Sequence, residues 1–338
     1  MTDKQSRWLV AGFALVTVLV YARVVTYGFV YEDRHVLPTT DVDWRFASST
    51  EWMFVRGAMA VSFRLTPVPW MAHAVNLMCH LGIGILVWSL ARRVLSPSSS
   101  ALAWIAPTIF WLHPLQVEAV AYLQGRSDQF IAAGTLVALW AITQSGSVRW
   151  WHGLLAVVGV VMALWTKEMG FVAIACVAWT VWWRQPRRLG WASLVVVIAV
   201  LVVSFWAVHR QEGAILHHAW LSGVSPWIFA GWSSVAWWEM VVLGTVWPFR
   251  LSVIYDVETL GVPWLLLALG ALAALMFWVW RRRLTVVGWA VGLALLSVLP
   301  RFALRLEEVM HEKHLYLAVA ALAIAVPAAM ARGQEDAP

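Results

Sequence analysis

The stretch Trp8–Tyr27, WLVAGFALVTVLVYARVVTY, runs directly into Gly28–His35, GFVYEDRH. The first part is apolar over the roughly 20 residues that an α-helix needs to cross a bilayer. It follows the short polar segment Met1–Arg7 without a small-residue cleavage site behind it, so we expect an uncleaved first membrane helix. The second part places two adjacent carboxylates, Glu32 and Asp33, at the mouth of that helix. Carboxylates near lipid are costly, which indicates a chemical role, the alternative being a pair of solvated loop acids.

Composition extends this interpretation to the whole chain. Of the 338 residues, 62% are hydrophobic and 12% are charged, whereas about a quarter are charged in a soluble domain. The apolar runs are long and continuous, unlike the alternating segments of a membrane β-barrel. The net charge of +6 comes from short basic clusters between these runs, so we expect no nucleic-acid partner. Cys79 and Cys176 lie inside apolar runs, which argues against a disulfide framework. The sequence predicts an all-α polytopic membrane protein.

Ten apolar runs predict ten spanning helices within a single domain, 1–338. They cover residues 8–27, 73–90, 101–117, 128–144, 150–166, 169–183, 190–208, 263–280, 285–300 and 315–331. Several are shorter than a perpendicular span requires and should be shielded by protein. Residues 227–247 are also apolar enough to span, but counting them would place Arg281–Arg283 outside, so we expect an interfacial segment there.

The basic clusters predict the orientation. With ten spans, Arg92-Arg93, Arg184–Arg188 and Arg281–Arg283 fall on the same side as Lys4 and Arg7. By the positive-inside rule that side is cytoplasmic, and both termini should lie there. The outer side then receives two larger segments. They are a long first loop, 28–72, which carries the acidic pair, and an interfacial segment, 209–262.

The segment 113–128 brings charges to the outer ends of two consecutive spans, namely His113, Glu118, Arg126 and Asp128. A guanidinium binds phosphate in bidentate fashion, so Arg126 is a candidate phosphate ligand. The alternative is a surface pair of Arg126 and Asp128 that caps a turn, since an acid also favours a helix N-terminus.

Two further charged motifs interrupt apolar sequence on the same side. A charged pair at membrane level, here Lys167-Glu168, indicates function unless the two charges only neutralise each other at a turn. Lys313 opens the last span, where free N–H groups favour an anion. Alternatively, this lysine only extends its ammonium to the interface.

The sequence gives little support for a metal site, for another cofactor or for a hydrolase. Six histidines are expected on the outer side: His35, His209, His217, His218, His311 and His314. Their spacing matches no metal-ligand motif, so we expect no metal and no other cofactor. The sequence contains no GxGxxG, P-loop or nucleophile-elbow motif, which leaves nucleotide hydrolysis and serine hydrolysis without support.

Taken in order, several short motifs resemble the C-type (GT-C) integral membrane glycosyltransferases. The closest resemblance is to the transmembrane O-mannosyltransferases that target cadherins and to their bacterial relatives. The motifs are GFVYED at 28–33, VR at 55–56, VSFRL at 61–65, HAVN at 73–76, HP at 113–114, EAVA at 118–121, GRSD at 125–128, TKE at 166–168, WPFRLS at 247–252 and EKHLYL at 312–317. Each motif is short, and the specific part is their shared order along nearly the whole chain.

The resemblance implies a GT-C-like bundle in a bacterial inner membrane, with its active face in the periplasm. It also implies an inverting transfer of a sugar from a polyprenyl phosphate to a protein Ser/Thr, a glycan or a lipid. Either Glu32 or Asp33 would be the base. The cations expected around the leaving phosphate are Arg126, Lys167, Arg56 and Lys313, with His113, Glu118, Asp128, Glu168 and Tyr316 in support. Membrane lipids, and partner membrane subunits in a larger complex, would be its other partners.

The chain also departs from the family pattern. Glu32 stands where the family has Asp first, and Lys313 stands where Arg is usual. The printed sequence to Pro338 contains no tetratricopeptide repeats, which the cadherin-targeting proteins carry. A second hypothesis is therefore a catalytically inactive GT-C-like subunit of a larger membrane complex. A transporter would need internal repeats and charges at mid-membrane, and the sequence has neither.

Overall fold

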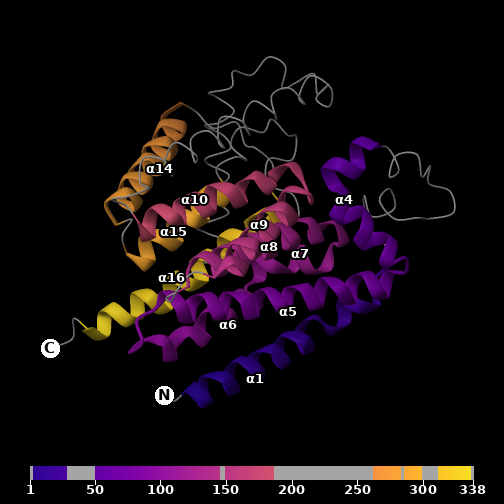
Figure 1. The fold of residues 1–338 in the computed structure, drawn as a ribbon, viewed down its shortest axis with the longest axis horizontal. Coiled ribbons are helices and arrows are strands. Elements are labelled where there is room, and N and C mark those ends of the chain that lie inside the picture. Colours follow the sequence, from indigo (N-terminus) through magenta and orange to yellow (C-terminus); the bar gives the residue numbers. More distant parts are fainter. Residues whose placement is uncertain are drawn as a thin grey trace.

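The computed structural model describes residues 3–28, 50–144, 149–185, 262–282, 285–298 and 311–335. Within these ranges every regular element is a helix, as predicted (Figure 1). The α-helices are α1 (Asp3–Tyr21), α4 (Thr50–Leu65), α5 (Pro69–Val94), α6 (Ile105–Leu112), α7 (Val117–Ala121), α8 (Arg126–Ile142), α9 (Trp150–Leu164), α10 (Val172–Arg184), α14 (Val262–Arg282), α15 (Val286–Val298) and α16 (Tyr316–Glu335). Short 3-10 helices include η1 (Ala22–Thr26), η3 (Pro114–Gln116), η4 (Leu123–Gly125), η5 (Glu168–Phe171) and η8 (Glu312–Leu315).

Each predicted span that falls on described residues coincides with helical structure, whereas 190–208 and the interfacial segment 227–247 lie outside them. Three helical stretches in the described chain are long and apolar enough to cross a membrane: Lys4–Thr26, Pro69–Val94 and Glu312–Ala331. Shorter apolar helices cover Ser100–Leu112, Trp150–Leu164, Met169–Arg184 and Val286–Val298. The chain is a membrane protein, but these lengths do not confirm the predicted count of ten spans.

The segment 28–72, expected as a long outer loop, contains the helix α4. One face of α4 is buried through Met59 and Phe63. The backbone of α4 also meets the end of α9, because the Ala58 amide donates to the Trp165 carbonyl at 3.2 Å. An added Cβ at Gly57 would lie 2.3 Å from the Trp165 indole. This long-range packing holds α4 against the end of α9, which the local sequence pattern does not indicate.

The helices α8 and α9 pack closely against each other at a pair of glycines. An added Cβ at Gly134 would lie 2.4 Å from the carbonyl oxygen of Gly159, and the reverse distance is also 2.4 Å. Small residues at a helix crossing allow such contact between backbones within a membrane. This crossing sets the position of α8, whose first turn carries Arg126 and Asp128.

The described arginines of the basic clusters lie at one end of the bundle, as the predicted orientation requires. Arg93 at the end of α5 donates to the Trp140 carbonyl of α8 at 3.3 Å. Arg184 at the end of α10 donates to the Gln144 carbonyl at 3.0 Å. The ends of α10 and α14 meet there too, through a ring contact of Trp182 with Trp280 at 5.0 Å between centroids. We call this the basic end; that it faces the cytoplasm stays a prediction.

Substituting Gly159 by Leu should destabilise the protein, because the added side chain meets the backbone of α8 and neither helix can yield without separating. Overpacking of this kind costs roughly 1–3 kcal/mol or more. Gly153 is the matched control on the same helix, since a Cβ there would meet nothing within 4 Å. Thermal unfolding in detergent should show a lower Tm for Gly159→Leu and little change for Gly153→Leu. Equal Tm values for the two variants would contradict the close crossing.

Candidate functional site

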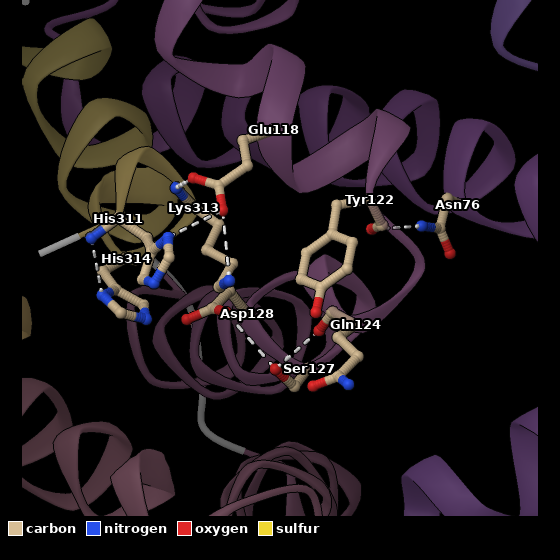
Figure 2. Close-up of polar contacts among 9 residues, drawn as sticks. All are labelled: Asn76, Glu118, Tyr122, Gln124, Ser127, Asp128, His311, Lys313 and His314. Carbon is tan, nitrogen blue, oxygen red and sulfur yellow. Dashed lines mark hydrogen bonds and ion pairs between the residues drawn. The ribbon is translucent and has the colours of Figure 1, made fainter. Parts of the chain in front are cut away.

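The end opposite the basic end gathers charged residues from two distant parts of the chain, the segment 117–128 and the segment that precedes α16. Glu118 comes from α7, Asp128 from the first turn of α8, and Lys313 from η8, as Figure 2 shows. The chain reaches this place by turns rather than by long helices. The helix α6 ends at Leu112, and the next residue, His113, has the extended backbone that is favoured before a proline. The short helices η3, α7 and η4 then lead to α8.

Glu118 binds two residues of the distant segment that precedes α16. One carboxylate oxygen, Oε1, lies 3.1 Å from Lys313 Nζ and 3.2 Å from His311 Nδ1. The other oxygen, Oε2, accepts the Lys313 backbone amide at 3.0 Å. The Lys313 ammonium also lies 4.5 Å from the centre of the Tyr122 ring, which provides a cation–π contact. A single carboxylate thus fixes both the backbone and the side chain of Lys313 (Figure 2).

Electrostatics explain why this buried carboxylate stays ionised. Glu118 and Lys313 are each only 9% exposed. Burial alone would raise the pKa of Glu118, but the hydrogen bond from His311 and the charge of Lys313 hold that pKa below its ordinary value. Removing one partner of such a pair leaves an uncompensated buried charge, which costs about 3–5 kcal/mol.

A small cavity lies beside Lys313. Asp128, His314, Tyr316 and Ser297 line it, together with Met169 and other apolar residues. Its volume is about 20 Å³, enough for one water molecule with polar partners. The cavity places Lys313 and His314 next to a space in which a small polar group can sit.

Arg126, the best predicted phosphate ligand, is fully buried in a cage of protein acceptors. Its Nε donates to Asn76 Oδ1 at 2.7 Å and its Nη2 to the Ala72 carbonyl at 2.7 Å. Its Nη1 donates to the hydroxyls of Ser62 and Thr66, both at 3.1 Å. In this arrangement the guanidinium holds α4 and α5 against α8. Phosphate binding by Arg126 stays a prediction, and it would require the guanidinium to exchange these acceptors for a ligand.

Asn76 links Arg126 to the segment that carries Glu118 through hydrogen bonds. Its Nδ2 donates to the carbonyls of Val120 and Tyr122 at 3.3 and 3.2 Å, the segment that carries Glu118 (Figure 2 shows the Tyr122 contact). Asn76 was not among the predicted site residues. The available signal was an amide within the apolar run 73–90, because a polar group inside a membrane helix needs a partner.

Tyr316, predicted to support the site, belongs to a buried network that joins α5, α6 and α16. Its hydroxyl lies 2.7 Å from His80 Nδ1, and His80 Nε2 lies 3.1 Å from the Trp111 carbonyl. Since that carbonyl can only accept, we assign the proton to Nε2, and Nδ1 then accepts from the tyrosine hydroxyl. The Trp111 indole returns a hydrogen bond to the His80 carbonyl at 3.1 Å.

The other predicted residues are placed as follows. His113 caps η3, since its Nδ1 accepts the Leu115 amide at 3.2 Å. Asp128 lies in the first turn of α8, as expected of an acid at a helix N-terminus, and its Oδ2 accepts from Ser127 Oγ at 3.3 Å. Lys167 is half-buried and precedes η5, two residues before Met169 at the cavity.

Several predictions lie outside what the structure describes. Glu32 and Asp33 lie outside the described residues altogether, and for Arg56 and Glu168 only the backbone is described. Of the six histidines considered for a metal, only His311 and His314 are described. Within the described part of the chain, no three His, Cys, Asp or Glu side chains are grouped so as to hold a metal ion.

Comparison with known proteins gives a partial resemblance. No family model matches the chain, and no solved structure matches it. Protein O-mannosyl-transferase Tmtc1 of Drosophila melanogaster is 29% identical over 191 residues, 48% of this chain and 21% of that protein. Protein O-mannosyl-transferase Tmtc2 of the same organism is 30% identical over 154 residues, 39% of this chain and 16% of that protein. The match thus spans about a fifth of each relative, and it supports a distant, glycosyltransferase-like resemblance.

Replacing Arg126 by Ala should destabilise the protein strongly, because Asn76, Ser62 and Thr66 lose a donor in a buried place. Each buried acceptor that is left without a hydrogen bond destabilises the folded state by about 1–3 kcal/mol. Arg126→Lys should recover only part of the loss, since an ammonium lacks the planar fork. Arg64→Ala removes an exposed arginine of α4 and serves as the control. Thermal unfolding in detergent measures all three, and a wild-type Tm for Arg126→Ala would contradict the cage.

The ion pair of Glu118 predicts a specific pH dependence of stability. Because the folded-state pKa of Glu118 is lowered, its contribution is full above the ordinary pKa of 4.5 and is lost as the pH falls through the lower value. Unfolding of the wild type and of Glu118→Gln should be compared between pH 7 and pH 3.5. The difference in stability should be constant at neutral pH and shrink below pH 4.5. A difference that stays constant throughout would show that Glu118 is not the titrating group.

Proposed function

We propose that this protein is an inverting glycosyltransferase that moves a sugar from a polyprenyl phosphate to an acceptor at the periplasmic face of a membrane. The observation that carries the proposal is the similarity to two protein O-mannosyl-transferases, at 29% and 30% identity. The structure adds support at one place, where Glu118 and Lys313, both predicted from the sequence as site residues, form a buried pair beside a small cavity.

The proposed reaction is a single displacement at the anomeric carbon. Glu32 or Asp33 takes the proton of the acceptor hydroxyl, and the acceptor oxygen attacks the anomeric carbon from the face opposite the phosphate. The bond from that carbon to the phosphate oxygen breaks, and the polyprenyl phosphate leaves with the electron pair. The products are the glycosylated acceptor with inverted configuration and the lipid phosphate.

Cations near the leaving phosphate stabilise the charge that develops there. Lys313 is the best supported of the predicted cations, because Glu118 holds its ammonium at 3.1 Å and it borders the cavity. A lysine acts as a point charge, whereas an arginine would bind the phosphate through two parallel hydrogen bonds. Lys167 and Arg56 belong to segments close to this end, and we propose them as further phosphate ligands. Arg126 contributes to the site through Asn76.

The test of this proposal is transfer by the purified protein from polyprenyl-phosphate sugars to Ser/Thr peptides, with Glu32→Gln and Asp33→Asn compared against the wild type. At least one variant should lose transfer by about 100-fold or more, the usual contribution of a general base. Both variants should keep the wild-type Tm, because neither change removes apolar packing. If both retain full activity, the base is wrongly assigned; if the wild type transfers no sugar, the enzyme proposal fails.

One observation favours a second function, that of a non-catalytic membrane subunit. Glu118 pairs with both Lys313 and His311, and the cavity beside them has a volume of about 20 Å³. A scaffold would use these pairs only to hold its fold. It would purify from its native membrane in a stoichiometric complex and remain inactive with every donor, whereas an enzyme would transfer sugar on its own.

A further inference from the structure

A groove at the basic end lies far from the candidate site and has no role in the proposed transfer. It runs between α1 and α5, and its volume is about 540 Å³. Two arginines line it, Arg7 of α1 and Arg92 of α5. The rest of its wall is mainly apolar, with Ala11 and Ala14 on one side and Ile85 on the other.

The helix geometry places both arginines at the same mouth. Arg7, Ala11 and Ala14 are spaced by four and three residues, which puts them on one face of α1. Ile85, Trp88 and Arg92 follow the equivalent spacing on α5, in the opposite chain direction. Because Arg7 is near the start of α1 and Arg92 near the end of α5, the charged mouth lies at the basic end. The apolar bed continues from it for about 10 Å, the rise of seven helical residues.

This combination of a cationic mouth and an apolar bed has the chemistry of an anionic lipid. Both helices are long and apolar enough to cross a membrane, so the groove opens toward lipid. The neighbouring surface of α1 is apolar as well, with Leu15, Leu19 and Val20 more than 60% exposed. Arginine binds phosphate oxygens with its planar fork. Basic pockets between membrane helices attract anionic headgroups.

We propose that this groove binds one anionic diacyl phospholipid of the surrounding bilayer. Its phosphate lies between Arg7 and Arg92, and one acyl chain follows Ala11, Ala14 and Ile85. The Arg92 guanidinium lies 5.2 Å from the centre of the Trp88 ring, which orients it along the wall of the groove. The occupant differs from the sugar donor of the proposed reaction, whose phosphate belongs at the opposite end beside Lys313. The lipid site is independent of whether the protein transfers sugar.

Native mass spectrometry of the full chain in detergent tests the site directly. The protein is titrated with phosphatidylglycerol and with phosphatidylcholine of the same acyl chains. We expect one tightly bound phosphatidylglycerol, and weaker binding of the neutral lipid. Arg7→Gln and Arg92→Gln should each weaken phosphatidylglycerol binding about fivefold, the contribution of one basic side chain near an anionic membrane surface. Ala11→Phe should weaken both lipids by filling the bed.

Lys4→Gln is the matched control, because Lys4 is an exposed basic residue of α1 at the same end that does not line the groove. It should bind phosphatidylglycerol as the wild type does. Equal binding of the two lipids, or wild-type binding by the double arginine variant, would overturn the proposal. Tighter, arginine-dependent binding of polyprenyl phosphate than of phosphatidylglycerol would also overturn it, because the occupant would then be an isoprenoid lipid. The Tm of each variant without lipid confirms that it is folded.

Discussion

A polar group inside a membrane bundle is costly unless it finds a partner within the protein, because lipid offers none. The described structure meets this constraint repeatedly. Arg126 is surrounded by acceptors from α4 and α5, and His80 pairs with Tyr316 and a backbone carbonyl. The Trp289 indole, fully buried, donates to Thr180 at 3.0 Å. Each of these contacts joins different helices, so the same bonds that satisfy polar groups also fix how the helices pack.

The constraint also shapes the candidate site. In the proposed function, a cation that stabilises the leaving phosphate cannot be left alone in an apolar bundle, since an unpaired buried charge is costly. Glu118 resolves this conflict by holding Lys313 while leaving it at the border of a cavity. Arg126 differs from Lys313 because its guanidinium is fully hydrogen-bonded to protein groups. Through its bond with Asn76 it instead helps to position the loop that carries Glu118.

Apolar runs were enough to predict where most described helices lie. The run 150–166 became α9 at Trp150–Leu164, and 263–280 became α14 at Val262–Arg282. Long-range contacts were not predictable in this way. The α4 helix packs against Trp165, and Lys313 is 195 residues from Glu118 along the chain. The sequence identified the residues of that pair but not their bond. The acidic pair Glu32–Asp33 lies outside the described residues and stays a prediction.

The double contact of Glu118 with Lys313 has a consequence for how the protein is made. A chain is synthesised from its N-terminus, so α7 and its carboxylate exist before residue 313 has left the ribosome. Until then Glu118 lacks its cation, and an unpaired carboxylate in apolar surroundings is costly. The ion pair can form only once the segment before α16 is in place, and one carboxylate then binds both the backbone amide and the side chain of Lys313. Completion of the site therefore requires that every segment up to η8 has been synthesised.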